Sequence, residues 1–130
     1  MWGYNGDGAL GDSTLSGDIF SPVQIDPSKY GNKSVVDVCA NEYTSYILCG
    51  DTTLYSAGYN GGGECGLGHM DDPVIDFTEA LDGFTMIDAS NGTVVGLKSD
   101  NTLWYWGYIP WTYVETATPT QFNWPSSPII

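Results

Sequence analysis

The chain has 130 residues, a length typical of one domain, and it is strongly acidic. Its 16 acidic residues, against three lysines and no arginine, give a net charge of −13, which repels phosphate backbones and argues against nucleic-acid binding. No apolar run approaches the roughly 20 residues that span a bilayer, and the first residues, MWGYNGDG, lack the pattern of a signal peptide. We therefore expect no nucleic acid and no membrane insertion, and the acidity favours a virion or an extracellular location over the cytoplasm.

The predicted elements, in chain order, are short strands separated by turns. A glycine-rich segment opens the chain at residues 2–12 (WGYNGDGALGD). Strands are expected at residues 35–40, 45–49 and 53–57, followed by a second glycine-rich segment at 57–69 (AGYNGGGECGLGH). Hairpin turns are expected at Gly50-Asp51, at residues 99–101 and, most strongly, at Asn91-Gly92. Helix signals are nearly absent, so the pattern indicates an all-β fold.

The three cysteines form an odd number, which argues against a disulfide framework. A hairpin of residues 35–40 and 45–49 would place Cys39 opposite Ser45 and Cys49 roughly 13 Å further along the strand, at about 3.3 Å per residue. A disulfide needs Cα atoms within about 7 Å of each other. We therefore predict that Cys39 and Cys49 are small, unpaired residues of the sheet.

The sequence contains an internal repeat. Residues 35–58 align with residues 84–107 without a gap, at an offset of 49 residues, and seven aligned positions are identical. Trp2-Gly3 matches Ala57-Gly58 and Trp106-Gly107, so the unit begins three times. All-β repeats of this length, with about four short strands each, are typical of β-propeller blades.

The predicted fold class is therefore an all-β, partial β-propeller with two to three blades of short antiparallel strands and no substantial helix. We expect a single repeat domain over residues 1–130. Its units are predicted at residues 1–34, which form a partial blade, and at residues 35–83 and 84–130.

The recurring residues resemble a known family. Residues 96–107 (GLKSDNTLWYWG), and residues 2–12 followed by 21–25 (SPVQI), resemble the regulator-of-chromosome-condensation repeat, which builds seven-bladed β-propellers. The resemblance covers nearly the whole chain and implies about two and a half blades. It departs from the family where glycine and histidine are usual, because the chain has Asn41 and Thr44, then Ser90 and Thr93. Residues 108–122 also replace the glycine-rich loop, so we expect the third unit to be degenerate and to cap the array.

The resemblance also implies two activities of the family, nucleotide exchange and chromatin binding. Chromatin binding uses basic contacts, which Lys29, Lys33 and Lys98 cannot supply by themselves. Exchange activity depends on one face of an entire propeller, and no motif in the chain identifies that face. Exchange therefore remains an alternative without a motif to support it.

The glycine-rich segments invite a second interpretation, because Gly61, Gly63 and Gly66 have the spacing of a dinucleotide-binding turn. Such a turn must open a helix whose N-terminal amides hold the pyrophosphate. The residues that follow are rich in Gly, Ser, Asp and Pro, and they cannot begin a helix. We predict loop glycines and no cofactor.

Metal binding and catalysis find little support in the sequence. Cys65 and His69 are candidate zinc ligands with Asp71 and Asp72 nearby, but structural zinc takes four ligands in recognised pairs. The single histidine has no nucleophile in a known motif, and no G-x-S-x-G sequence occurs. We predict no metal site and no catalytic residue, so the chain is not expected to be an enzyme.

The aromatic residues gather in residues 104–113 (WYWGYIPWTY). Trp104 and Trp106 are expected on one face of a strand, within the blade core. The other aromatic residues either belong to the core as well or form an exposed contact surface for a protein or a glycan. This candidate interaction surface consists of Tyr105, Tyr108, Trp111 and Tyr113.

Two and a half blades do not close a propeller, so the open sheet faces and strand edges must be covered by further blades of a longer chain, by copies of this chain or by a different protein. We expect a non-enzymatic repeat protein that mediates protein–protein contacts, as a structural or decorating subunit of a larger assembly such as a virion. Its partners are expected to be other protein subunits or copies of itself. The alternative is a carbohydrate-binding or adhesion module that uses the aromatic residues of 104–113 to hold a glycan.

Overall fold

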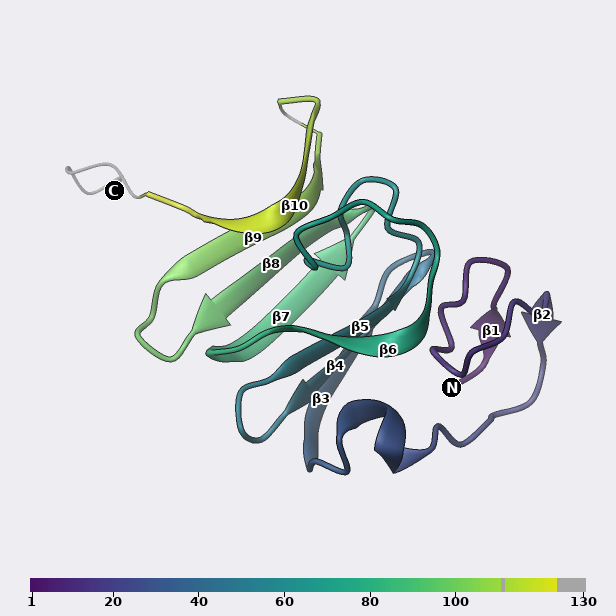
Figure 1. Ribbon diagram of the computed structural model, residues 1–130. Helices are drawn as coiled ribbons and strands as arrows, with labels where there is room; N and C mark the ends of the chain where they lie inside the picture. The colour runs from purple at the N-terminus through teal and green to yellow at the C-terminus, as the bar shows by residue number, and fades with distance from the viewer. Residues whose placement is uncertain (111, 124–130) are drawn as a thin grey trace.

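A computed structural model describes residues 1–110 and 112–123 and shows a chain built from β-strands (Figure 1). Over these residues the helical content is one 3₁₀ turn, η1 (Pro27–Tyr30), and no helix is long and apolar enough to cross a membrane. The prediction of an all-β fold without substantial helix is confirmed. The strands are β1 (Gly3–Tyr4), β2 (Asp18–Ile19), β3 (Val35–Ala40), β4 (Thr44–Cys49), β5 (Leu54–Gly58), β6 (Val74–Leu81), β7 (Phe84–Ser90), β8 (Thr93–Lys98), β9 (Leu103–Ile109) and β10 (Val114–Gln121).

The strands form two four-stranded antiparallel sheets in which neighbours in sequence are neighbours in space. We call the sheet of β3 to β6 the first blade and the sheet of β7 to β10 the second blade. Residues 1–34 are the N-terminal unit, in which β1 and β2 form a sheet of two short strands. Strand β3 packs against β7, so the two blades stand side by side (Figure 1).

The turn between β3 and β4 sets the register of the first blade. The side-chain oxygen of Asn41 accepts hydrogen bonds from the backbone N–H groups of residues 43 and 44, at 3.1 and 2.9 Å. Cys39 consequently lies opposite Tyr46, and its predicted pairing with Ser45 is wrong by one residue. The reason is that the Asn41 side chain closes a turn one residue longer than the sequence pattern suggested.

The corresponding turn of the second blade is shorter. Ser90 lies opposite Thr93, which leaves Asn91 and Gly92 as a two-residue turn. Both have positive φ, 48° and 81°, as a type I′ turn requires. The predicted hairpin at Asn91-Gly92 is confirmed.

The main core lies between the two blades. The rings of Trp106 and Phe84 meet edge to face with their centroids 5.5 Å apart. Trp104 packs against the same cluster, which confirms that both tryptophans face the core. Full burial of each large apolar side chain contributes roughly 1.5–3 kcal/mol, so contact between blades is a main source of stability. The buried members are Tyr46, Leu48, Leu54, Phe84, Ile87, Val94 and Trp106.

A second core lies between the first blade and the N-terminal unit. Met1, Ile25 and Tyr30 of the N-terminal unit pack against buried residues of the first blade. The central strands of the first blade, β4 and β5, are therefore covered on both of their faces. The buried members of this second core are Ile47, Cys49, Tyr55, Ala57 and Phe77.

The cysteines behave as small sheet and loop residues. Cys39 lies in β3, Cys49 in β4, and Cys65 in the long loop after β5. All three are free thiols, which confirms the predicted absence of a disulfide.

Asp51 organises the turn between β4 and β5. Its carboxylate accepts hydrogen bonds from the N–H of Thr53, at 3.1 Å, and from the Thr53 hydroxyl, and it lies 3.1 Å from the ammonium of Lys33. These contacts, with the Thr53 hydroxyl first, lower the pKa of Asp51 from 3.8 to about 2. A carboxyl whose pKa is depressed by folding stabilises the fold fully above its unfolded pKa, and this contribution is lost as the pH falls through the folded pKa.

We expect Asp51→Asn to remove a component of acid sensitivity between about pH 4 and pH 2. The asparagine keeps an acceptor for the Thr53 N–H but loses the charge that titrates. Urea unfolding of both proteins from pH 7 to pH 2 measures the difference, which should shrink as the pH approaches 2. An Asp51 carboxyl that titrates by NMR at or above 3.8 would contradict the assignment.

Candidate functional site

One end of the sheets carries a tyrosine from each of the three units. Tyr4, Tyr59 and Tyr108 each follow a glycine with positive φ, which is 117° at Gly3, 119° at Gly58 and 88° at Gly107. Glycine adopts such angles readily, whereas other residues rarely do. The sequence contains this feature as the triplets WGY, AGY and WGY. The predicted match between the units ends at the glycine of each triplet, so the tyrosine lies one residue beyond it.

A fourth tyrosine, from the β3–β4 turn, joins this row. The ring of Tyr43 makes edge contacts with Tyr4 and Tyr59, at centroid distances of 5.7 and 6.5 Å. The two ring planes meet that of Tyr43 at 74° and 66°. The N-terminal unit and the first blade thus present a continuous group of phenol rings at this end.

The glycine-rich loop after β5 is held by a buried asparagine. The side-chain oxygen of Asn60 accepts from the N–H of Cys65 at 3.0 Å, and its amide nitrogen donates to the carbonyl oxygens of His69 and Asp71. Asn5 makes the same bond to the N–H of the residue five positions later in the N-terminal unit, at 2.8 Å. The two segments are therefore equivalent structural loops.

The loop glycines allow close packing against the second blade. A side chain at Gly63, where φ is 80°, would collide with the backbone at residues 116 and 117 of β10. At Gly66, where φ is 69°, it would meet the ring of Trp106. The hydrogen bonds of Asn60 and these close contacts give the glycines of this segment a structural role. The next element after the segment is strand β6, so no helix begins there.

Glu64 lies in this loop between the two blades. Its backbone oxygen accepts hydrogen bonds from the hydroxyl of Tyr46, at 2.8 Å, and from the indole nitrogen of Trp106, at 3.0 Å. The residue is 4% exposed, and its carboxylate oxygen Oε2 accepts from the N–H of Gly62 at 2.9 Å. Core residues of both blades thus fix the position of this acidic residue.

The surroundings of Glu64 disfavour its charge. Burial raises the pKa of Glu64, and the nearby carboxylates of Glu115 and Asp72 raise it further, while the backbone hydrogen bonds act in the opposite direction. Burial first, and then Glu64, Asp72, Glu115 and Asp7, also raise the pKa of Tyr59. The carboxylates of this end therefore act together on one small region.

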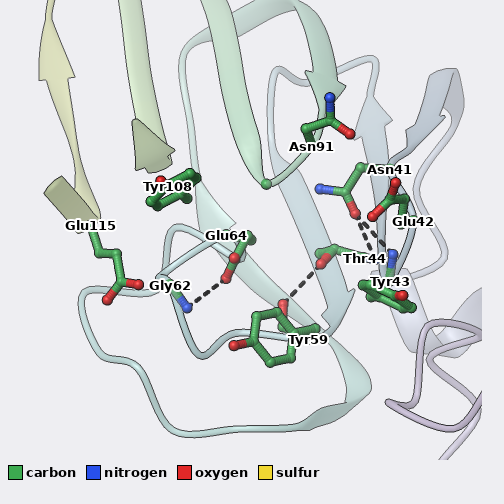
Figure 2. A pocket seen from close by; sticks show the side chains of 11 residues that line it. Asn41, Glu42, Tyr43, Thr44, Tyr59, Gly62, Glu64, Asn91, Tyr108 and Glu115 are labelled. Carbon is green, nitrogen blue, oxygen red and sulfur yellow. Dashed lines mark hydrogen bonds between the residues drawn. The ribbon is translucent and has the colours of Figure 1, made fainter. Parts of the chain in front are cut away.

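These residues enclose a cavity of about 230 Å³ between the ends of the two blades, which we call the inter-blade cavity. Figure 2 shows side chains from both blades around it. The amide nitrogen Nδ2 of Asn41 is buried and has no hydrogen-bond partner in the described part of the chain. The residues that characterise the lining are Asn41, Tyr43, Tyr59, Glu64, Tyr108 and Glu115.

The lysines of the chain are occupied elsewhere. Lys29 pairs with Asp76, and Lys33 pairs with Asp51. The ammonium of Lys98 lies over the rings of Phe84 and Trp104, 5.3 and 4.2 Å from their centroids. None of the three lines the inter-blade cavity, so its carboxylates are not neutralised by a basic side chain of this protein.

The structure places the predicted aromatic surface residues at different positions. Tyr105 lies in β9 opposite Val95, and Tyr108 lines the inter-blade cavity. Tyr113 is 84% exposed in the turn between β9 and β10, and Trp111 lies outside the described residues.

Cys65 and His69 have separate environments. Cys65 is fully buried, and burial raises the pKa of its thiol to about 12. His69 is exposed and accepts a hydrogen bond from the N–H of Asp71. Among residues 1–110 and 112–123, no group of three or more His, Cys, Asp or Glu side chains is arranged to hold a metal ion.

No protein-family model matches the chain. Its structure is similar to yeast RCC1 (Prp20) in a crystal structure with Kap60, at 21% identity and a TM-score of 0.77, covering 94% of this chain and 32% of that one. It is also similar to Prp20p from Saccharomyces cerevisiae, at 20% identity and a TM-score of 0.78, covering 94% and 33%. Human WBSCR16 matches at 20% identity and a TM-score of 0.73, covering 92% and 33%.

These similarities extend over nearly all of the present chain, which spans about a third of the length of each of these proteins. At this level of identity they establish the fold. They confirm the predicted architecture, since the order and pairing of the strands in both sheets are those of consecutive blades. The chain therefore has the fold of a partial β-propeller, with blades similar in structure to those of yeast RCC1 (Prp20).

Proposed function

We propose that this chain is a non-enzymatic protein-interaction module and a structural subunit of a larger assembly. Its sheets pack face to face against blade-like sheets of other protein chains. A virion is one assembly of this kind. The observation that carries the proposal is the outer face of the second blade, the face turned away from the first blade.

The internal repeat identifies what this outer face is built to do. At the offset of 49 residues, Tyr46, Leu48 and Leu54 of the first blade are each 0% exposed because the second blade covers them. The equivalent residues of the second blade are Val95, Leu97 and Leu103, which are half-buried. A position that packs against a neighbouring blade in one repeat thus lacks that neighbour in the next.

The outer face is also apolar. It carries a hollow of about 250 Å³ lined by Met86, Val95, Leu97 and Leu103, with Asp88 as the one charged residue of the lining. Met86 is 62% exposed. Burying this surface under another sheet would gain roughly 25 cal/mol for each Å² of apolar area removed from water.

The N-terminal unit is open as well. Trp2 is 68% exposed, whereas the equivalent residues Ala57 and Trp106 are 0% exposed. Phe20, in the same unit, is 89% exposed. Sheet neighbours cover the equivalent positions in the two blades, so these exposed aromatic residues offer a second surface for contact with another protein.

The similar proteins support the class of partner. Yeast RCC1 (Prp20) was crystallised with Kap60 and was also studied for its binding to Gsp1p and histones, so a protein of this fold binds other proteins. We propose protein partners for this chain on the same basis. Among protein partners we favour copies of this chain, because its two blades already pack against each other. A blade of a second copy would make the same kind of contact with the outer face.

Lysine substitutions on the outer face are expected to weaken self-association at least tenfold, which corresponds to about 1.4 kcal/mol. Sedimentation velocity over the micromolar range compares the wild-type chain with Leu97→Lys and Met86→Lys. Because Met86 is already exposed, its variant should fold normally, and circular dichroism checks both variants. Val114→Lys, on an exposed residue at the start of β10, serves as the control.

A wild-type chain that sediments as a stable monomer throughout this range would overturn the proposal. Equal weakening by Val114→Lys would also count against it, because the outer face would then have no special role.

The alternative of a carbohydrate-binding or adhesion module rests on Tyr113, whose exposed ring could stack on a sugar. Tyr105 and Tyr108 lie in the outer sheet face and the inter-blade cavity, so they are separately placed. We rank this function second. Loss of glycan-array binding in Tyr113→Ala would favour it over lateral assembly.

A further inference from the structure

We propose that the inter-blade cavity binds the side chain of a lysine or an arginine from a basic partner peptide. The site is separate from the lateral faces described above, and it does not depend on them. It rests on a buried carboxylate without a cationic partner, on the tyrosines around it, and on an unpaired amide donor beside it.

The first observation is the buried carboxylate of Glu64. Its oxygen Oε2 accepts the N–H of Gly62, and no lysine of the chain lies in the cavity to neutralise the charge. Removing a carboxylate from water without full compensation is costly. A cationic donor that enters the cavity would supply the missing opposite charge together with a charge-assisted hydrogen bond.

The second observation is the aromatic lining. Tyr43, Tyr59 and Tyr108 border the cavity from three different elements. Aromatic faces attract ammonium and guanidinium groups, and they also pack against the methylene groups that carry those charges. A lining of phenol rings and carboxylates is therefore suited to a basic side chain and disfavours an anion.

The third observation is the electrostatic setting. Glu42 and Glu115 line the same cavity, and the charge of Asp72 reaches Glu64 and Tyr59. The three lysines of the chain are engaged away from this cavity, as described above. In a protein of net charge −13 this end attracts cations from solution and offers them a partly desolvated position.

The unpaired donor indicates a peptide as the source of the cation. The amide nitrogen of Asn41 is buried at the edge of the cavity and lacks an acceptor among the described residues. A backbone carbonyl oxygen next to the basic side chain would accept this hydrogen bond, whereas a free metal ion or a simple amine would not.

The size of the cavity agrees with a single side chain. Its volume of about 230 Å³ lies below the roughly 300–1,000 Å³ of pockets that enclose drug-sized ligands. No metal-binding group of side chains is found in the described part of the chain, and a phosphate would meet three glutamates. A lysine or arginine side chain satisfies both the volume and the charge.

The test uses the full chain labelled with ¹⁵N and three blocked peptides, Ac-Gly-Arg-Gly-NH₂, Ac-Gly-Lys-Gly-NH₂ and Ac-Gly-Gln-Gly-NH₂. The two basic peptides should shift the backbone amide signals of Gly62 and Gly92, which border the cavity, in titrations to millimolar concentration. The glutamine peptide should not. Tighter binding of one basic peptide would assign the site to guanidinium or to ammonium, and either result supports the proposal.

Glu64→Gln is the decisive variant. The glutamine oxygen can still accept the Gly62 N–H, so the loop should keep its structure, but the charge is lost. We expect binding of the basic peptides to weaken at least tenfold. Asp82→Asn is the matched control, because it removes one charge from the loop between β6 and β7, at the opposite end of the sheets, and it should change binding less than twofold.

Tyr59→Leu keeps an apolar side chain but removes a ring, and it should weaken binding several-fold. Equal weakening by Asp82→Asn and Glu64→Gln would overturn the proposal, since binding would then reflect the overall acidity alone. The absence of shifts at Gly62 and Gly92 would overturn it as well. Met86→Lys, which is designed to break lateral association, should bind the peptides normally, so failure of one proposal is distinguishable from failure of the other.

Discussion

Replacing Trp106 by alanine is expected to destabilise the chain by about 3–5 kcal/mol, the usual cost of removing a large buried aromatic side chain. Trp106 is fully buried, its ring contacts Phe84, and its indole nitrogen donates to the backbone oxygen of Glu64. It therefore joins both blades and the long loop. Since domains of this size are stable by roughly 5–15 kcal/mol, the loss is a large part of the total. Urea unfolding followed by circular dichroism measures it.

Two further variants separate the causes of this loss. Trp106→Phe keeps a buried ring and removes the N–H donor, and it should cost about 1–3 kcal/mol. Trp104→Ala, in the same strand, removes a partly buried ring that rests under Lys98, and it should cost less than Trp106→Ala. Equal losses at residues 104 and 106 would show that contact between the blades does not dominate stability.

Gly58→Ala is expected to destabilise the chain by roughly 2–6 kcal/mol, the sum of two separate penalties. The backbone there has φ of 119°, which costs a residue with a side chain roughly 1–3 kcal/mol. The added methyl group would also collide with the backbone oxygen of Tyr43 and with the Cα of Thr44, which adds roughly 1–3 kcal/mol for overpacking.

Gly3 offers a matched control for this prediction. It occupies the equivalent position in the N-terminal unit with nearly the same φ, 117°, but a methyl group added there would have no neighbouring atom within 4 Å. Gly3→Ala should therefore carry the conformational penalty without the collision, and it should be the milder variant in urea unfolding. Equal effects at both positions would mean that the collision with the β3–β4 turn contributes nothing.

The repeat made most of the fold predictable from sequence. The offset of 49 residues places Leu48 with Leu97 and Leu54 with Leu103, and these pairs occupy equivalent positions in two sheets with the same strand order. Turn chemistry gave the hairpin at Asn91-Gly92. It failed by one residue at the β3–β4 turn, where a hydrogen-bonding side chain, that of Asn41, decides the length.

The inter-blade cavity was beyond prediction for a physical reason. Its residues come from the β3–β4 turn, the loop after β5, the β7–β8 turn and the ends of β9 and β10, which no short motif connects. Glu64 stands inside a segment whose sequence pattern is dominated by glycine. The burial of its carboxylate depends on Tyr46 and Trp106, which meet its backbone only in the folded chain. The sequence offered one indication of this site, the recurrence of a tyrosine directly after the equivalent glycines Gly3, Gly58 and Gly107.

The claim that the chain works as an incomplete propeller joined to its neighbours is tested most directly by an electron cryo-microscopy reconstruction of the particle that the wild-type chain forms. We predict a β-sheet from another chain packed on Val95, Leu97 and Leu103, with further protein density beside Trp2. A single isolated chain, or an outer face covered only by this chain's own residues, would contradict the account.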